Sequence, residues 1–322
     1  MQTTDTPDTA WLDAQYNNRA LVPDFARHLQ HWASESERVR ADGVASGQAV
    51  LDVPFGWAPI DGLASPTLDV FRPGGARGAG AATGAEGGAV GGAPVLLFIH
   101  GGYWRALDKA DHSFVAAPFA EQGACVLVPN YSLVGAAQPM ARLSHITRQM
   151  RQAVLWAWQH VAHWGGDPRR ITVVGHSAGG QLVGMLLATD WVALGRAQGL
   201  DVPAGLVGQG VSISGLFDLE PIQRTPFLAD LQLTPEEALA QSPAACPAPT
   251  SCQLVAVVGG DESGEFKRQN RLIREAWGAG AVPVCEELPG LNHFSVLDSL
   301  AQPGSRLHGL VSDLLHHPSC AL

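Results

Sequence analysis

The sequence predicts an α/β fold in which a mainly parallel sheet of eight strands is covered by helices on both faces. Short apolar runs recur along the 322 residues, and helical patterns separate them. Most of the later runs are continuous rather than alternating, which is typical of strands buried on both faces. Strands that alternate with helices form parallel sheets, whose ligands bind at the carboxyl ends of the strands.

The predicted strands are runs of about four or five residues rich in Val, Leu and Ile. They span 50–53, 68–71, 95–99, 125–128, 171–174, 211–214, 254–258 and 284–288. Because 46% of the residues are hydrophobic, the chain can bury the core of one large domain. We expect residues 49–322 to form that domain.

Helical patterns lie before and between these strands. Residues 1–48 predict an amphipathic helical arm packed on the main domain. Apolar residues at three- and four-residue spacing predict a helix over 143–161, which the following glycines end. Thr234 begins a capping box, and residues 307–314 predict a last amphipathic helix.

Residues 73–92 consist almost entirely of Gly and Ala. Such a segment has too little side-chain surface to pack against a core. We therefore expect a flexible surface loop between two strands.

Composition and charge exclude several classes of partner. The formal net charge is −10 and no basic run exists, so nucleic acid and anionic membrane surfaces are not expected to bind. The start of the sequence lacks the basic and apolar regions of a signal peptide, and no apolar stretch has transmembrane length. Five scattered cysteines predict free thiols in a reducing, cytoplasmic compartment, with no metal and no cofactor. A small molecule is the expected partner, and a homodimer is left open.

The most informative motif is Gly175-His176-Ser177-Ala178-Gly179, which follows the strand predicted at 171–174. A G-x-S-x-G sequence between a strand and a helix is the nucleophile elbow of an α/β-hydrolase. The sharp turn exposes the serine hydroxyl at the edge of the sheet. Ser177 is therefore the predicted nucleophile, and the N–H of Ala178 is a predicted oxyanion-hole donor.

A serine nucleophile needs a base and an acid, which in this fold follow it in the order acid, then histidine. His293 follows the last predicted strand in a glycine-containing loop, so it is the predicted base. The acid is expected after the strand at 254–258, where Asp261 and Glu262 are both candidates. Spacing alone does not separate these two carboxylates.

The second part of the oxyanion hole is expected in the loop at 100–104, His-Gly-Gly-Tyr-Trp, which follows the strand at 95–99. Gly101, Gly102 and Tyr103 are the candidate backbone donors, because glycines let the backbone approach a substrate oxygen. We expect Tyr103, Trp104 and His176 to line the substrate pocket. His100 is expected to brace the loop rather than act as a base.

These residues resemble the kynurenine formamidase (arylformamidase) branch of the α/β-hydrolases. The family's H-G-G-x-W and G-H-S-A-G motifs match residues 100–104 and 175–179, and its final His-Phe pair matches His293 and the residue after it. Its acid segment resembles residues 262–269, which puts Glu262 at the acid position. The resemblance implies a metal-free hydrolase that cleaves an N-formyl group from an aniline-type nitrogen, as in N-formylkynurenine.

Two other functions remain open from the sequence. A carboxylesterase acting on small or aromatic esters would use the same serine, histidine and oxyanion loop. A non-catalytic binding protein of the same fold is a remote alternative, since a fold does not by itself establish a function.

Overall fold

The computed structural model describes residues 8–56, 63, 65–74, 92–135 and 141–316. Its centre is an eight-stranded sheet in the order β1-β2-β4-β3-β5-β6-β7-β8. The pairs β1–β2 and β2–β4 are antiparallel, and all later pairs are parallel. The strands are β1 Ala49–Pro54, β2 Thr67–Phe71, β3 Ala93–Ile99, β4 Cys125–Pro129, β5 Gly166–His176, β6 Val207–Ile213, β7 Gln253–Gly259 and β8 Val284–Leu288.

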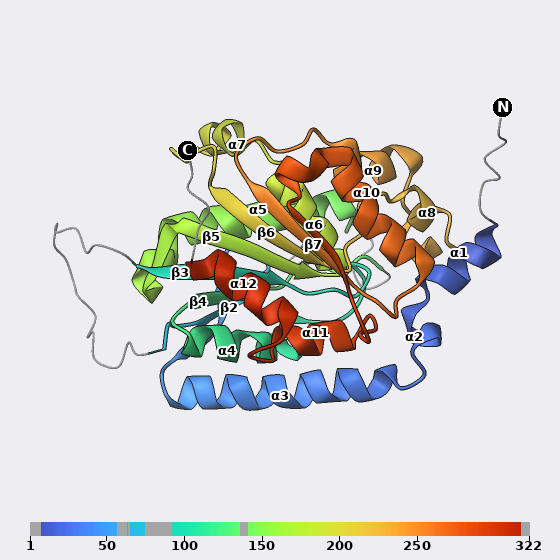
Figure 1. Cartoon of the computed structure of the whole chain (residues 1–322). Coiled ribbons are helices and arrows are strands. Elements are labelled where there is room, and N and C mark those ends of the chain that lie inside the picture. The colour runs from blue at the N-terminus through green and yellow to red at the C-terminus, as the bar shows by residue number, and fades with distance from the viewer. Residues whose placement is uncertain (1–7, 57–62, 64, 75–91, 136–140, 317–322) are drawn as a thin grey trace.

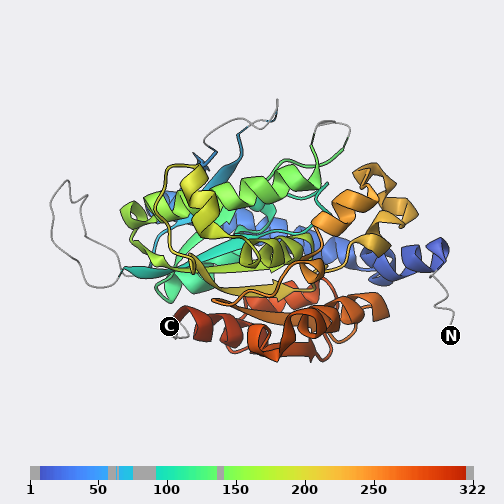
Figure 2. The ribbon, with the colours of Figure 1, turned by 90° about the horizontal axis from the view of Figure 1, so that it is seen from above.

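Helices cover both faces of the sheet, as Figures 1 and 2 show. They are α1 Thr9–Tyr16, α2 Asn18–Leu21, α3 Phe25–Ala45, α4 Ala116–Glu121, α5 Leu143–His160, α6 Ala178–Leu187, α7 Trp191–Ala197, α8 Glu220–Gln223, α9 Pro235–Ala240, α10 Gly264–Ala281, α11 Ser295–Leu300 and α12 Arg306–His316. Each of the predicted strands overlaps one of the eight observed. The predicted fold class is therefore confirmed.

The alternation of side chains along the central strands divides the core into two layers. On β3, Val95, Leu97 and Ile99 face a core shared with α1, α5, α6 and α10. Leu96 and Phe98 face the opposite core, which contains side chains of α3, α4, α11 and α12. Because successive residues of a strand point to opposite faces, a continuous apolar run fills both cores.

The N-terminal helices are integrated into both cores. Leu12 and Tyr16 of α1 belong to the first core, and Trp32 of α3 belongs to the second. The indole N–H of Trp32 donates to Asp298 at 2.5 Å, while the hydroxyl of Ser36 accepts from the N–H of Phe114 at 3.0 Å. The division into a helical arm, residues 1–48, packed on a main domain of residues 49–322 remains a proposal.

Local details differ from the expected boundaries. The helix predicted over 143–161 ends at His160 and continues as a 3₁₀ turn, Val161–Trp164, before Gly165 adopts a left-handed conformation with φ 90°. Thr234 accepts a hydrogen bond from the N–H of Glu237 at 3.1 Å, as a capping residue should. The flexible loop expected at 73–92 lies, apart from residues 73, 74 and 92, outside the described residues.

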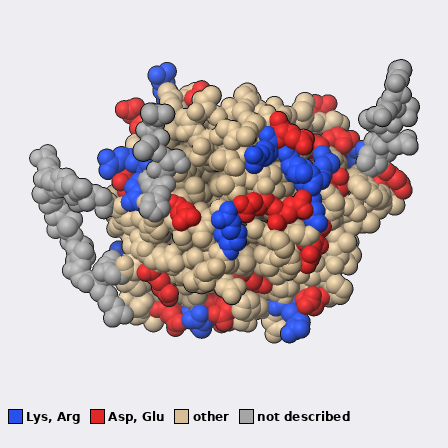
Figure 3. Space-filling model, viewed as in Figure 1, with Lys and Arg blue, Asp and Glu red and all other residues tan. Residues whose placement is uncertain are grey.

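Acidic and basic side chains lie interspersed on the face shown in Figure 3. Several basic residues near β8 pair with acidic ones, for example Arg271 with Glu287 at 2.8 Å and Arg306 with Glu286 at 2.6 Å. In the described part of the chain, no helix has the length and apolarity needed to cross a membrane.

Candidate active site

Ser177 occupies the sharp turn between β5 and α6. Its backbone has φ 55° and ψ −116°, an unfavourable region for a residue with a side chain. A Cβ at Gly175 would lie 2.2 Å from the carbonyl oxygen of Gly179, so only glycine permits this crossing. The N–H of Ser177 donates to Ile213 of β6 at 2.7 Å, which ties the turn to the sheet.

Glu262 and His293 meet beside this turn. The Nδ1 atom of His293 lies 2.6 Å from Oε2 of Glu262, and both side chains are buried. The other carboxylate oxygen of Glu262 accepts from the N–H of Gly259 at 2.7 Å and from the hydroxyl of Ser214 at 2.5 Å. Donors thus converge on both oxygens and fix the carboxylate toward the imidazole.

Asp261 lies apart from this contact. Its side chain is exposed, and its N–H donates to the carbonyl oxygen of Leu291 at 3.0 Å. The structure therefore brings Glu262, and not Asp261, to His293. Ser214, which the sequence analysis did not single out, is a further partner of Glu262. The only signal for Ser214 was its place at the end of a predicted strand.

The loop after β3 comes close to the serine. A Cβ at Gly101 would lie 3.1 Å from the Cβ of Ser177, and a Cβ at Gly102 would lie 2.1 Å from the carbonyl oxygen of Ala106. Gly102, Tyr103 and Trp104 have φ values of 104°, 50° and 56°. Three consecutive left-handed residues curl the backbone into a tight loop next to the serine, where its amides can face a ligand.

His100 stabilises this loop through contacts with Gly101, Asn130 and Tyr131. Its Nδ1 lies 2.8 Å from the carbonyl oxygen of Gly101, and its Nε2 lies 3.1 Å from Oδ1 of Asn130. The ring stacks on Tyr131 at a centroid distance of 4.3 Å. Burial lowers the pKa of His100 below its ordinary value. These contacts agree with a bracing role.

Trp104 requires a correction, because it does not line the pocket. It is fully buried, and its indole N–H donates to Oε1 of Gln181 on α6 at 3.1 Å. The left-handed backbone at residues 103 and 104 turns the indole into the core, where it packs beneath α6, the helix that follows Ser177. Tyr103 and His176, the other two expected pocket residues, do line the cavity.

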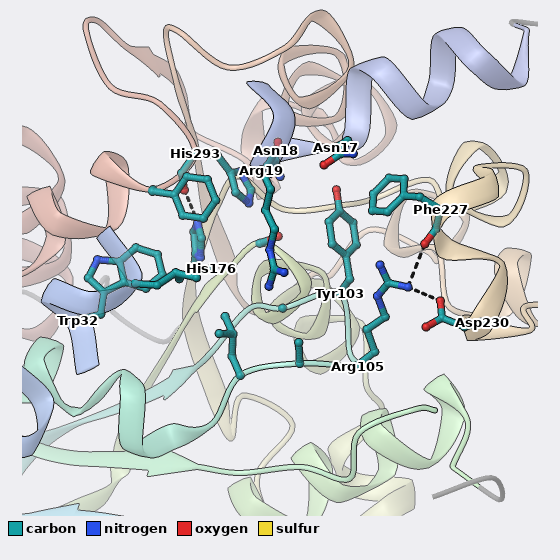
Figure 4. Close-up of a pocket in the computed structure, with 16 residues that line it drawn as sticks. Asn17, Asn18, Arg19, Trp32, Tyr103, Arg105, His176, Phe227, Asp230 and His293 are labelled. Carbon is teal, nitrogen blue, oxygen red and sulfur yellow. Dashed lines mark hydrogen bonds and ion pairs between the residues drawn. The ribbon is translucent and has the colours of Figure 1, made fainter. Parts of the chain in front are cut away.

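Ser177 and His293 open into one cavity of about 480 Å³, shown in Figure 4. That volume suits a small-molecule ligand. Its wall includes the aromatic rings of Trp32, Tyr103 and Phe227. Arg105 forms an ion pair with Asp230 at the edge and donates to the carbonyl oxygen of Phe227 at 2.9 Å.

His176 supports the loop that carries His293. Its Nε2 lies 2.9 Å from the carbonyl oxygen of His293, to which an Nε2–H donates. Burial, followed by the neighbouring His293, holds the pKa of His176 well below its ordinary value. A neutral His176 with its proton on Nε2 therefore fixes the backbone of residue 293. Among the described residues, no group of three or more His, Cys, Asp or Glu side chains could hold a metal ion.

Ser177 lies in the turn between β5 and α6, beside the pair of His293 and Glu262. This arrangement, in a mainly parallel sheet, is that of a hydrolase of the α/β-hydrolase fold. A family model described as BD-FAE matches residues 87–194. A solved structure of a Silicibacter sp. protein, described as a “putative thioesterase”, is 30% identical, with a TM-score of 0.73 and coverage of 94% of this chain and 98% of that one. Esterase 2 of Thermogutta terrifontis has a TM-score of 0.57 at 18% identity, over 83% of this chain and 92% of that chain, and shares the fold.

The chain belongs to the α/β-hydrolase family and resembles its kynurenine formamidase branch. Kynurenine formamidase of Danio rerio is 27% identical over 318 residues, which cover 97% of this chain and 96% of that protein. The corresponding protein of Salmo salar is 27% identical over 310 residues, with coverage of 94% and 93%. The resemblance and the enzyme class expected from the sequence are therefore confirmed.

Proposed function

We propose that this hydrolase is an arylformamidase that acts through an acyl-enzyme on formamides similar to N-formylkynurenine. The observation that carries the proposal is the 2.6 Å contact of His293 with Glu262, beside the cavity that Ser177 and His293 share. The similarity to the fish kynurenine formamidases supports the choice of substrate.

In the proposed mechanism the hydroxyl oxygen of Ser177 attacks the formyl carbon, and Nε2 of His293 takes the hydroxyl proton. Glu262 accepts from Nδ1–H of His293 and stabilises the imidazolium that forms. Backbone N–H groups of Ala178 and of residues 101–103 stabilise the oxyanion of the tetrahedral intermediate.

The C–N bond then breaks, and the imidazolium of His293 gives its proton to the departing arylamine. Water attacks the formyl ester on Ser177 while His293 takes a proton from it. Collapse of the second intermediate releases formate and restores the hydroxyl of Ser177.

The wall of the cavity supports an aromatic leaving group. The cavity of about 480 Å³ beside Ser177 has the rings of Trp32, Tyr103 and Phe227 in its wall. A formyl group needs almost no acyl pocket, whereas an arylamine fits against aromatic walls.

The test is a comparison of kcat/KM for N-formylkynurenine and p-nitrophenyl acetate with the same enzyme preparation. An arylformamidase turns over the formamide at least as efficiently as the activated ester. If only the ester is hydrolysed, the carboxylesterase alternative replaces this proposal. If neither reacts and a fluorophosphonate does not label Ser177, the non-catalytic alternative replaces both.

We further propose a cytoplasmic location, with a small molecule as the partner and no nucleic acid or membrane bound. The four cysteines in the described part of the chain are free thiols, which supports a reducing compartment. The mixed charges on the face shown in Figure 3, with the formal net charge of −10, support the absence of a nucleic-acid partner. The homodimer remains a prediction.

A further inference from the structure

Arg19 of α2 is a cation in the wall of the candidate active site. It lines the same cavity as Ser177 and His293, and Figure 4 shows its side chain extending from α2 into the cavity between His176 and Tyr103. The guanidinium carbon lies 5.5 Å from the centre of the Phe25 ring. In the described part of the chain, no acidic side chain lies within ion-pair distance of Arg19.

The second arginine of the cavity already has an ionic partner. Arg105 pairs with Asp230. Burial keeps the pKa of His176 well below its ordinary value, so His176 adds no positive charge. Arg19, whose side chain is exposed, is therefore the arginine of the cavity that is available to an anionic ligand.

The neighbouring Asn18 provides a second, independent observation. It lines the same cavity and is only 6% exposed, yet its amide nitrogen Nδ2 has no hydrogen-bond partner in the described part of the chain. A buried amide without a partner is costly unless a ligand completes it. A guanidinium and an amide at adjacent positions match the two oxygens of a carboxylate.

The segment that carries both residues is held firmly around the cavity. The hydroxyl of Tyr103 donates to the carbonyl oxygen of Tyr16 at 2.7 Å, and the N–H of Phe227 donates to Oδ1 of Asp13 at 3.1 Å. Asn17 then caps α2, since its Oδ1 accepts from the N–H of Ala20 at 3.2 Å. The backbone that carries Arg19 is thus held by contacts on either side of the site.

We propose that Arg19, assisted by Asn18, binds a carboxylate on the leaving group of the substrate. These two residues of the N-terminal segment then select, among aryl formamides, those whose leaving group carries a carboxylate. The inference rests on the proposed function for the formamide bond. The carboxylate contact itself is independent of which acyl bond is cleaved.

The test compares two substrates that differ in one group, N-formylkynurenine and its carboxamide, with wild type, Arg19→Met and Arg27→Met. Arg27 is an exposed arginine of α3 that does not line the cavity, so it is the matched control. We expect Arg19→Met to lower kcat/KM for the carboxylate substrate by about 10- to 100-fold, mainly through KM. On the carboxamide the change stays within about twofold, and Arg27→Met alters neither substrate. Arg19→Lys is expected to recover part of the lost kcat/KM, because lysine restores the positive charge but not the planar, two-pronged hydrogen bonding of a guanidinium.

Equal losses of Arg19→Met on both substrates, or no loss relative to Arg27→Met, would overturn the proposal. A parallel pair of esters, 4-acetoxybenzoate and its carboxamide, separates this result from a failure of the proposed function. If wild type hydrolyses the esters but neither formamide, the arylformamidase assignment is wrong. The effect of Arg19→Met on kcat/KM for 4-acetoxybenzoate, relative to its effect on the carboxamide ester, then tests the role of Arg19. A loss confined to 4-acetoxybenzoate supports the carboxylate contact, and equal losses overturn it.

Discussion

The hydroxyl of Tyr103, in the loop after β3, donates a 2.7 Å hydrogen bond to the main-chain carbonyl of Tyr16, the last residue of α1. This contact joins residues 87 positions apart and connects the N-terminal helices to the loop beside Ser177. Tyr16 is itself fully buried, and its hydroxyl donates to Oε2 of Glu265 on α10 at 2.7 Å. The N-terminal segment is therefore part of the wall of the candidate site.

Tyr103→Phe is expected to lower the free energy of unfolding by about 1 kcal/mol, because the carbonyl of Tyr16 loses its donor at a partly buried position. Urea unfolding monitored by tryptophan fluorescence measures the change. An unchanged free energy of unfolding would show that this hydrogen bond contributes nothing to the attachment of α1.

Ser177→Ala is expected to remove activity by a factor on the order of 10³ or more, since the members of a catalytic triad act as a unit. The substitution also removes only one oxygen atom, so the far-UV circular dichroism spectrum should be that of wild type. Steady-state turnover of N-formylkynurenine and p-nitrophenyl acetate measures the loss. An alanine variant with wild-type turnover would contradict the serine mechanism for both substrates.

Glu262→Gln is expected to lower kcat by about 10²- to 10⁴-fold, because the amide no longer holds the charged imidazole of His293. Asp261→Asn is the matched control, since its exposed side chain lies one residue away and does not reach His293. It should change kcat by less than about threefold. If Asp261→Asn lowered kcat by this much and Glu262→Gln did not, the acid of the triad would be Asp261 instead of Glu262.

The buried histidines behind the site predict a loss of stability in mild acid. Burial, with His100 as a second cause, lowers the pKa of His112 from 6.5 to about 3. The unfolded chain then binds a proton as the pH falls below about 6.5, while the folded protein does not. The contribution of neutral His112 to the free energy of unfolding is therefore complete above pH 6.5. It is lost progressively as the pH falls from 6.5 to about 3.

The measurement is the free energy of unfolding at pH 7.5 and pH 5.5 in wild type, His112→Phe and His163→Gln. Each proton taken up only on unfolding lowers the stability by up to about 1.4 kcal/mol per pH unit. His112→Phe should flatten this dependence, whereas His163→Gln, an exposed control, should retain it. Parallel pH dependences in all three proteins would exclude His112 as a source.

The sequence by itself determined the strand segments of the sheet and the candidate nucleophile. Apolar runs such as 95–99 and 171–174 are buried on both faces, so their composition alone identifies them as central strands. The elbow is also local, because glycines at 175 and 179 and the serine between them encode the turn within five residues. Such signals need no knowledge of distant contacts.

Only the tertiary structure decided which distant groups meet. Spacing left Asp261 and Glu262 equivalent, and the resemblance favoured Glu262. The fold then brought Glu262, and not its neighbour, to His293 across 31 positions of sequence. It also turned Trp104 into the core, whereas the hydrophobicity of an indole suits a core and a pocket wall equally.

The entry of Arg19 and Asn18 into the cavity was likewise absent from any motif. Their position depends on hydrogen bonds from Tyr103 and Phe227 to α1, which join segments 87 and 214 residues apart. Contacts at such separations depend on how whole elements pack, and no local pattern encodes them. Ser177 and His293, the candidate nucleophile and base, could thus be predicted from local sequence, while the residues that we propose to select the substrate emerged only from the packing of the N-terminal helices against the site.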